Sequence, residues 1–252
     1  MGRLLFIFSA LFMLWSPRLN AQLVKGVDES KIIYRNVVQG GVSLNSRGLG
    51  LHFRKGKKLH YTKTFLYDCS LQNLKHPKEV KSVNAFSKNS NGFLYGKLIS
   101  LNAIQLGAGI QKTIYPKNDT KSIAIGYSWF GGFSLAMAKP VYLYIFHQSD
   151  MEGIQEKLER YNPEKHFPDN ISSRAPFFKG FQQSRFYPGL YGTWQINCSF
   201  GSQEEKIKML ETGISLNAYP AKISIMADDQ PGQYLFFNFF IRFIFGKQWN
   251  HP

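Results

Sequence analysis

Residues that carry familiar enzyme or metal chemistry are scarce in this sequence. It holds two cysteines in 252 residues, Cys69 and Cys198, and no CxxC pair. The motifs GxSxG, GxxxxGK and HExxH are all missing, and the six histidines are scattered without zinc-type spacing. These absences exclude the common serine-hydrolase, P-loop and zinc-protease signatures. We therefore predict no cofactor and no metal.

Acidic residues are also few. Asp and Glu number 16 against 31 Lys and Arg, which gives a formal net charge of +15. Such a balance suits nucleic acid or an anionic surface. Residues 1–21 have the pattern of a signal peptide for export. We therefore expect contact with outer-membrane lipids or an acidic partner, and no nucleic acid. A merely solvated basic surface is the alternative.

Long apolar runs are limited to the beginning of the chain. Gly2-Arg3 precedes an apolar run from Leu4 to Trp15, and Leu19-Asn20-Ala21 offers a small-residue cleavage site. The run is shorter than the roughly 20 residues of a spanning helix, and no later stretch reaches that length. The sequence predicts a cleaved signal peptide over residues 1–21 and one exported domain over 22–252, with an uncleaved membrane anchor as the alternative.

Aromatic residues, by contrast, are plentiful, and the end of the chain arranges them with the period of a strand. Asn238 and Arg242 lie on one face of the run from Gln233 to Gly246. The opposite face is wholly apolar and consists of Leu235, Phe237, Phe239, Ile241, Phe243 and Phe245. This alternation is long enough for a transmembrane β-strand of about 9–11 residues. We predict an all-β, antiparallel up-and-down transmembrane β-barrel in an outer membrane, closed by this strand.

Seven further strands are expected before the closing one. They are Gly41 to Arg54, Leu59 to Leu71, Phe93 to Ile110, Ile123 to Met137, Val141 to Phe146, Leu190 to Phe200 and Leu210 to Ala218. Eight is a permitted even number. We expect a turn at Lys55 to Lys58 and a short helix from Glu152 to Tyr161. A secreted soluble β-barrel is the alternative fold.

The loop lengths expose a weakness in this strand count. Loops 72–92 and 149–187 are both long, yet eight strands assigned in this way place them on opposite sides of the membrane. Turns on the periplasmic side are usually short. A miscount of one strand is therefore kept as the alternative to eight.

The interior of such a barrel should be filled by side chains. Eight strands leave room for little else, so a conducting pore is not expected. Glu211 and Arg242 fall on inward faces, and we predict a structural ion pair between them because an unpaired buried charge is costly. A disulfide between Cys69 and Cys198 stays open: export permits one, but Cys198 lies on the apolar face of its strand.

One spacing suggests catalysis. His147 and Ser149 are two residues apart at the end of an expected strand, as in outer-membrane lipid A deacylases, where an acid orients the histidine. Candidates for that acid are Asp150, Glu152, Glu156 and Glu159, none at a diagnostic spacing. We expect that the protein is not an enzyme and keep a lipid-modifying enzyme as the alternative function.

Several short segments resemble a family of uncharacterised small outer-membrane barrels of the Bacteroidota type. They include Asn36-Val37-Val38-Gln39-Gly40-Gly41, Leu74-Lys75-His76-Pro77-Lys78-Glu79, Lys139-Pro140-Val141-Tyr142-Leu143, Ile223-Ser224-Ile225-Met226-Ala227 and Phe245-Gly246-Lys247-Gln248-Trp249. The resemblance implies a non-enzymatic accessory or structural subunit of an envelope complex, either the barrel-assembly machinery or type IX secretion. Its partners would be other outer-membrane or periplasmic proteins. No functional residue carries over from it.

Overall fold

The computed structural model describes residues 34–84, 92–117, 122–149, 153–201, 205–228 and 231–250. The side chains of residues 148, 149, 153 and 154 are not described. The predicted signal peptide, residues 1–21, lies outside the described residues and stays a prediction. Within the described ranges, no helix has the length and apolar character needed to cross a membrane.

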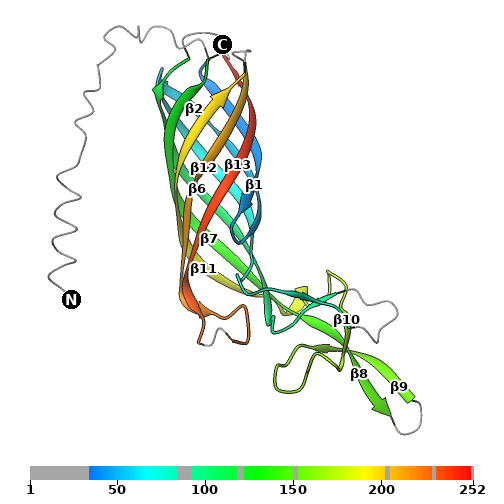
Figure 1. Cartoon of the computed structure of the whole chain (residues 1–252). Helices are drawn as coiled ribbons and strands as arrows, with labels where there is room; N and C mark the ends of the chain where they lie inside the picture. Colours follow the sequence, from blue (N-terminus) through cyan, green and yellow to red (C-terminus); the bar gives the residue numbers. More distant parts are fainter. Residues whose placement is uncertain are drawn as a thin grey trace, which may run out of the picture. The chain divides into compact units, whose positions relative to one another are not determined.

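Eight antiparallel strands close into a barrel with the order β1-β13-β12-β11-β7-β6-β3-β2 (Figure 1). They are β1 (Asn36–Asn45), β2 (Gly48–His60), β3 (Lys63–Leu74), β6 (Ile99–Tyr115), β7 (Ala124–Pro140), β11 (Arg185–Phe200), β12 (Lys206–Ile223) and β13 (Gln233–Trp249). Pairing of β1 with β13, from Asn36↔Trp249 to Asn45↔Phe240, closes the ring. The predicted all-β, up-and-down barrel of eight strands is confirmed.

The two faces of the barrel wall have opposite polarity. On β13 the six apolar residues predicted to face lipid are all exposed, whereas Asn238 and Arg242 are buried. On β7 the outward residues Trp129 and Phe133 are exposed, and Ser128 is buried. A water-soluble barrel would bury its apolar face instead. An apolar outside around a polar inside is the arrangement of a transmembrane barrel, so the soluble alternative is wrong.

The narrow interior explains why small residues line parts of the wall. Gly107 of β6 lies opposite Gly132 of β7. A Cβ atom on Gly107 would meet the carbonyl oxygen of Gly131 and come within 2.6 Å of the Tyr191 hydroxyl. Neighbouring backbone cannot move away cheaply, so the close packing of this wall requires glycine there.

The first predicted strand, Gly41 to Arg54, is wrong because it merges two strands. The chain reverses at Ser46-Arg47, between β1 and β2, and Gly48 takes a positive φ of 138°. The predicted turn at Lys55 to Lys58 is also wrong, since these residues continue β2. Gly48 follows the turn of a hairpin, where a positive φ favours glycine.

Two predictions for the segment after β7 are wrong as well. Val141 to Phe146 is not a strand of the barrel but falls largely within β8 (Tyr142–Ser149), which belongs to a separate sheet. Glu152 to Tyr161 is not a helix, because β9 (Gly153–Arg160) pairs with β8 as an antiparallel hairpin. The strand count of eight stays correct because one strand is gained near the start and one is lost here.

These corrections also resolve the loop difficulty. One end of the barrel carries the connections from β2 to β3, from β6 to β7 and from β11 to β12, together with the first residue of β1 and the last of β13. We call it the short-loop end. The other, the long-loop end, carries 46–47, 75–98, 141–184 and 224–232. Both long loops therefore lie at the same end, as an outer-membrane barrel requires.

The loop from 141 to 184 contains a small three-stranded sheet of order β10-β8-β9, completed by β10 (Ile171–Arg174). We call residues 141–184 the loop module. The module also contains the short 3-10 helix η1 (Phe181–Gln183). Its own apolar cluster consists of Leu143, Ile145, Tyr161 and Ile171 together with Phe93 from β5 (Phe93–Leu94), which pairs with β4 (Lys81–Ser82). The module is thus a packed unit rather than an irregular loop.

Candidate functional site

Four charged side chains meet inside the barrel. Arg54 Nε donates to Asp68 Oδ1 at 2.8 Å, and Arg54 Nη1 reaches both oxygens of Glu211 at 2.8 and 3.0 Å. Arg242 Nη1 donates to Glu211 Oε2 at 3.0 Å. Two cations and two anions leave this cluster with no net charge.

Register places these residues together. Arg54 lies directly opposite Asp68 on β2 and β3, and Glu211 lies opposite Arg242 on β12 and β13. Arg54 then joins the two cross-strand pairs by crossing the lumen to Glu211. The sequence had suggested only the Glu211–Arg242 contact. It missed Arg54 and Asp68, although alternation with the exposed Leu51 and Phe53 would have placed Arg54 inside.

Burial and packing make this cluster a structural plug. All four residues are 6% exposed or less. The Arg54 guanidinium lies 4.2 Å from the centroid of the Phe130 ring, and the Tyr191 hydroxyl donates to Asp68 Oδ2 at 3.2 Å. A substrate has no access to groups so enclosed. We infer that the cluster fixes the barrel interior rather than performing chemistry.

A polar layer lies beside the charged cluster. Ser70 Oγ donates to Gln105 Oε1 at 2.8 Å, and Gln105 Nε2 donates to Asn217 Oδ1 at 2.5 Å. These residues come from β3, β6 and β12, and each is buried. Side chains therefore bridge the lumen between opposite walls, as expected for a barrel of eight strands.

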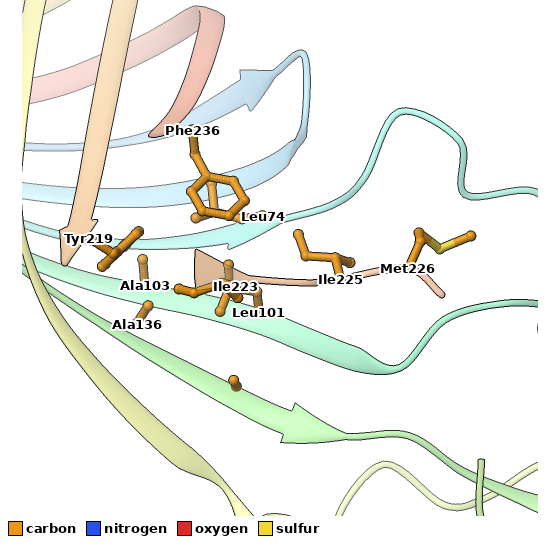
Figure 2. Packing of buried hydrophobic residues seen from close by; sticks show 10 residues of the cluster. Leu74, Leu101, Ala103, Ala136, Tyr219, Ile223, Ile225, Met226 and Phe236 are labelled. Carbon is orange, nitrogen blue, oxygen red and sulfur yellow. The ribbon is translucent and has the colours of Figure 1, made fainter. Parts of the chain in front are cut away.

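An apolar cluster closes the long-loop end of the lumen (Figure 2). Its members are Leu74, Leu101, Ala103, Ala136, Ala138, Tyr219, Ile223, Ile225, Met226 and Phe236. Ile225 and Met226 come from the loop after β12, where Leu98 N donates to Ile225 O at 2.9 Å and Ala227 N donates to Gly96 O at 2.7 Å. Two loops thus seal the mouth together, and a Lys97–Glu79 ion pair of 2.8 Å links the two ends of the loop between β3 and β6.

The loop module brings His147 to an acid. His147 Nε2 lies 2.9 Å from Glu159 Oε1, and His166 Nε2 lies 3.3 Å from Glu159 Oε2. Of the other candidate acids, Asp150 and Glu152 lie outside the described residues, and Glu156 accepts a hydrogen bond from Ser172 at 2.7 Å. Ser149 pairs with Gly153 at the end of the β8–β9 hairpin. The structure therefore supplies an orienting acid, while the serine side chain is not described.

The same contacts have a structural explanation. His166 Nδ1 accepts from Asn162 N at 3.1 Å, so Glu159 and His166 hold the turn that follows β9. The pKa of Tyr161 is raised, mainly by burial and to a smaller extent by the neighbouring Tyr95. The Tyr161 hydroxyl accepts a hydrogen bond from Gly96 N at 3.3 Å. No His, Cys, Asp or Glu cluster of three or more in the part of the chain that the structure describes is arranged to hold a metal ion.

Both cysteines are free. Cys69 is exposed, and Cys198 is partly exposed on the outward face of β11. The disulfide that export would permit is therefore not formed between them. A thiol facing lipid behaves as a small apolar side chain.

Comparisons with known proteins assign no function to this chain. No protein-family model matches the chain, and no curated protein matches it significantly. Among solved structures, the chain is similar to Neisserial surface protein A, with 9% identity, a TM-score of 0.37, and coverage of 86% of this chain and 96% of that one. So distant a likeness carries no argument about function. The membrane β-barrel rests on the strand pairing and on the apolar outer face.

Proposed function

We propose that this protein is a non-enzymatic integral outer-membrane barrel, an accessory or structural subunit of an outer-membrane biogenesis or secretion complex. The observation that carries the proposal is the combination of a plugged, sealed lumen with a folded module in its longest loop. A barrel whose lumen is filled conducts no solutes and can serve to anchor its loops in the membrane. A loop module with its own packed apolar cluster is suited to bind a partner protein. Barrel-assembly machinery and type IX secretion are the two settings we favour.

The loop lengths support an orientation. Outer-membrane barrels have short periplasmic turns and longer extracellular loops. The short-loop end would then face the periplasm. The barrel's first strand, β1, begins at this end, and its last strand, β13, ends there. The loop module would be presented outside the cell, next to the outer leaflet.

An aromatic patch supports binding by the module. Phe177 and Phe178 are 67% and 80% exposed, and their rings contact Phe181 of η1. Lys139, from the outward face of β7, lies 4.3 Å from the Phe177 ring centroid and donates to the Phe177 carbonyl oxygen. Exposed aromatic rings beside a cation suit the boundary between lipid and water, or a partner surface seated there.

Removal of the module tests the proposal. Residues 142–183 would be replaced by a short Gly-Ser linker, and the variant and wild type would be purified from detergent-solubilised membranes of the native host. We expect both to show a heat-modifiable band, and only wild type to retain co-purifying outer-membrane or periplasmic proteins. An unchanged set of co-purifying proteins, or none with wild type, would contradict the proposal.

A second candidate function follows from the His147–Glu159 contact. With Ser149 as nucleophile, these residues would make an acyl hydrolase acting on lipid A from the barrel rim. We expect instead that Ser149→Ala leaves the lipid A mass spectrum unchanged, because Glu159 also holds His166. One additional acyl chain on lipid A in that strain would favour the enzyme.

A further inference from the structure

The barrel wall is much lower on one side. β1 spans 10 residues and β2 spans 13, whereas β12 and β13 span 18 and 17. In Figure 1 the blue turn between β1 and β2 lies partway along the wall formed by the longer strands. The difference arises at the long-loop end, because β1 and β13 are paired up to Asn36↔Trp249 at the other end.

The low wall leaves one edge of β13 without a strand. The ladder with β1 ends at Asn45↔Phe240, followed by a 2.8 Å bond from Ser46 N to Phe239 O. β13 continues to Gln233 and stays paired with β12 as far as Ile223↔Gln233. Within the described ranges, no strand pairs with residues 235–238 on the other side. We call this the free edge of β13.

Alternation identifies the backbone groups at the free edge. The N–H and C=O groups of Phe239 point toward β1, as its contacts with Ser46 show. In a strand every second residue points its backbone groups to the same side. Leu235 and Phe237 therefore present their N–H and C=O groups to the free edge, whereas Phe236 and Asn238 bond to β12.

This edge continues the apolar outer face of the barrel. Leu235 and Phe237 belong to the apolar outward face that runs to Phe245, and they are 57% and 42% exposed. That face has the length of about 9–11 residues with which a strand spans the hydrocarbon. Backbone groups without partners are costly there, and acyl chains offer neither donors nor acceptors. The free edge thus requires an occupant with a backbone of its own.

The surroundings leave room for such an occupant outside the lumen. Phe236, on the inward side, is 1% exposed and packs in the apolar cluster of the mouth. Below the free edge, an outward groove of about 580 Å³ is lined mainly by apolar side chains that include Leu44, Trp194, Phe239 and Ile241. An extended segment along β13 would meet apolar surface on its lipid side and a filled wall on the other.

A second copy of this chain does not fit. Copies inserted in one membrane are related by an axis along the membrane normal. Strands tilt by about 35–45° in such barrels, so their β13 strands would cross at about 70–90°, twice the tilt. Strands crossing at that angle form no ladder.

We infer that the free edge of β13 accepts an extended segment of a partner protein, which pairs with Leu235 and Phe237 and continues the ladder made by β1. The inference rests on the proposed role as a subunit of an outer-membrane complex. The segment would alternate apolar residues toward lipid, matching Leu235 and Phe237. Recognition would depend on backbone hydrogen bonds and apolar contacts rather than on charge.

Proline distinguishes the two edges of β13. Phe237→Pro removes an N–H group that has no partner strand within the described chain, so the barrel should fold as wild type. Asn238→Pro is the matched control that removes an N–H group paired with β12, and its heat-modifiable band should be lost. A photo-crosslinking phenylalanine analogue would replace Leu235, or Phe133 on β7 as a distant lipid-facing control, in cells of the native host.

We expect the Leu235 position to form one crosslink to a partner protein, the Phe133 position to form none, and Phe237→Pro to abolish the Leu235 crosslink. Equal crosslinking at both positions, a crosslink that survives Phe237→Pro, or a crosslink to residues 22–33 of the same chain would overturn the inference. Co-purifying proteins without any Leu235 crosslink would overturn the free edge as the docking site but not the proposed function. No co-purifying protein at all would overturn both.

Discussion

Replacing Glu211 by alanine should destabilise the barrel more than replacing its cross-strand partner Arg242. Glu211 accepts from Arg54 through both oxygens and from Arg242 through one. Its loss leaves two buried guanidinium groups with Asp68 as the one remaining anion of the cluster. The cluster then carries one positive charge inside a barrel where water cannot solvate it.

The contacts give the relative magnitudes. Breaking a buried ion pair by removing one partner costs about 3–5 kcal/mol, which we expect for Glu211→Ala. Arg242→Ala should cost less, about 1.5–3 kcal/mol, the range for a hydrogen bond to a charged group, because Glu211 keeps Arg54. The double variant, which combines Glu211→Ala with Arg242→Ala, retains the ion pair between Arg54 and Asp68 at 2.8 Å, and this pair has no net charge. It should therefore recover about 1 kcal/mol or more relative to Glu211→Ala alone.

The assay is urea unfolding in detergent micelles, with the folded fraction measured from the heat-modifiable band. A recovery of about 1 kcal/mol changes the ratio of folded to unfolded protein roughly fivefold. The control is the double variant that combines Glu211→Ala with Arg54→Ala. It should recover less stability relative to Glu211→Ala alone than the Glu211 and Arg242 double variant does, because it removes the cation that binds Asp68. A double Glu211 and Arg242 variant no more stable than Glu211→Ala would refute the reasoning from net charge.

Two further predictions concern the wall. Phe239→Arg places a charge midway along the lipid face and should cost roughly 2–4 kcal/mol of folding free energy. Phe245→Arg, at the edge of that face, should cost far less, and equal folded yields of the two variants in lipid vesicles would contradict the assigned depth. Gly107→Ala should reduce folded yield because its Cβ would meet backbone. Gly192→Ala, which has open space around it, should fold as wild type, and similar losses for both would show that backbone crowding is not the cause.

The sequence by itself determined the kind of barrel and the two faces of its best strands. A side-chain period of two, apolar on one side and small or polar on the other, is a local property that survives folding, and β13 follows it from Leu235 to Phe245. Glu211 and Arg242 were placed inside for the same reason. The number of strands was also correct, although one merged strand and one misplaced strand cancelled each other.

Only the tertiary structure decided which strands join the ring, because pairing partners are set by contacts distant in sequence. β8 begins with an apolar run that resembles part of a membrane strand, yet it pairs with β9 and β10 instead of the barrel. Arg54 and Asp68 became part of the charged cluster through closure of the lumen, which brings β2 within reach of β12. The free edge of β13 likewise follows from the unequal lengths of β1 and β13 once they are paired, a relation between strands that neither strand shows alone.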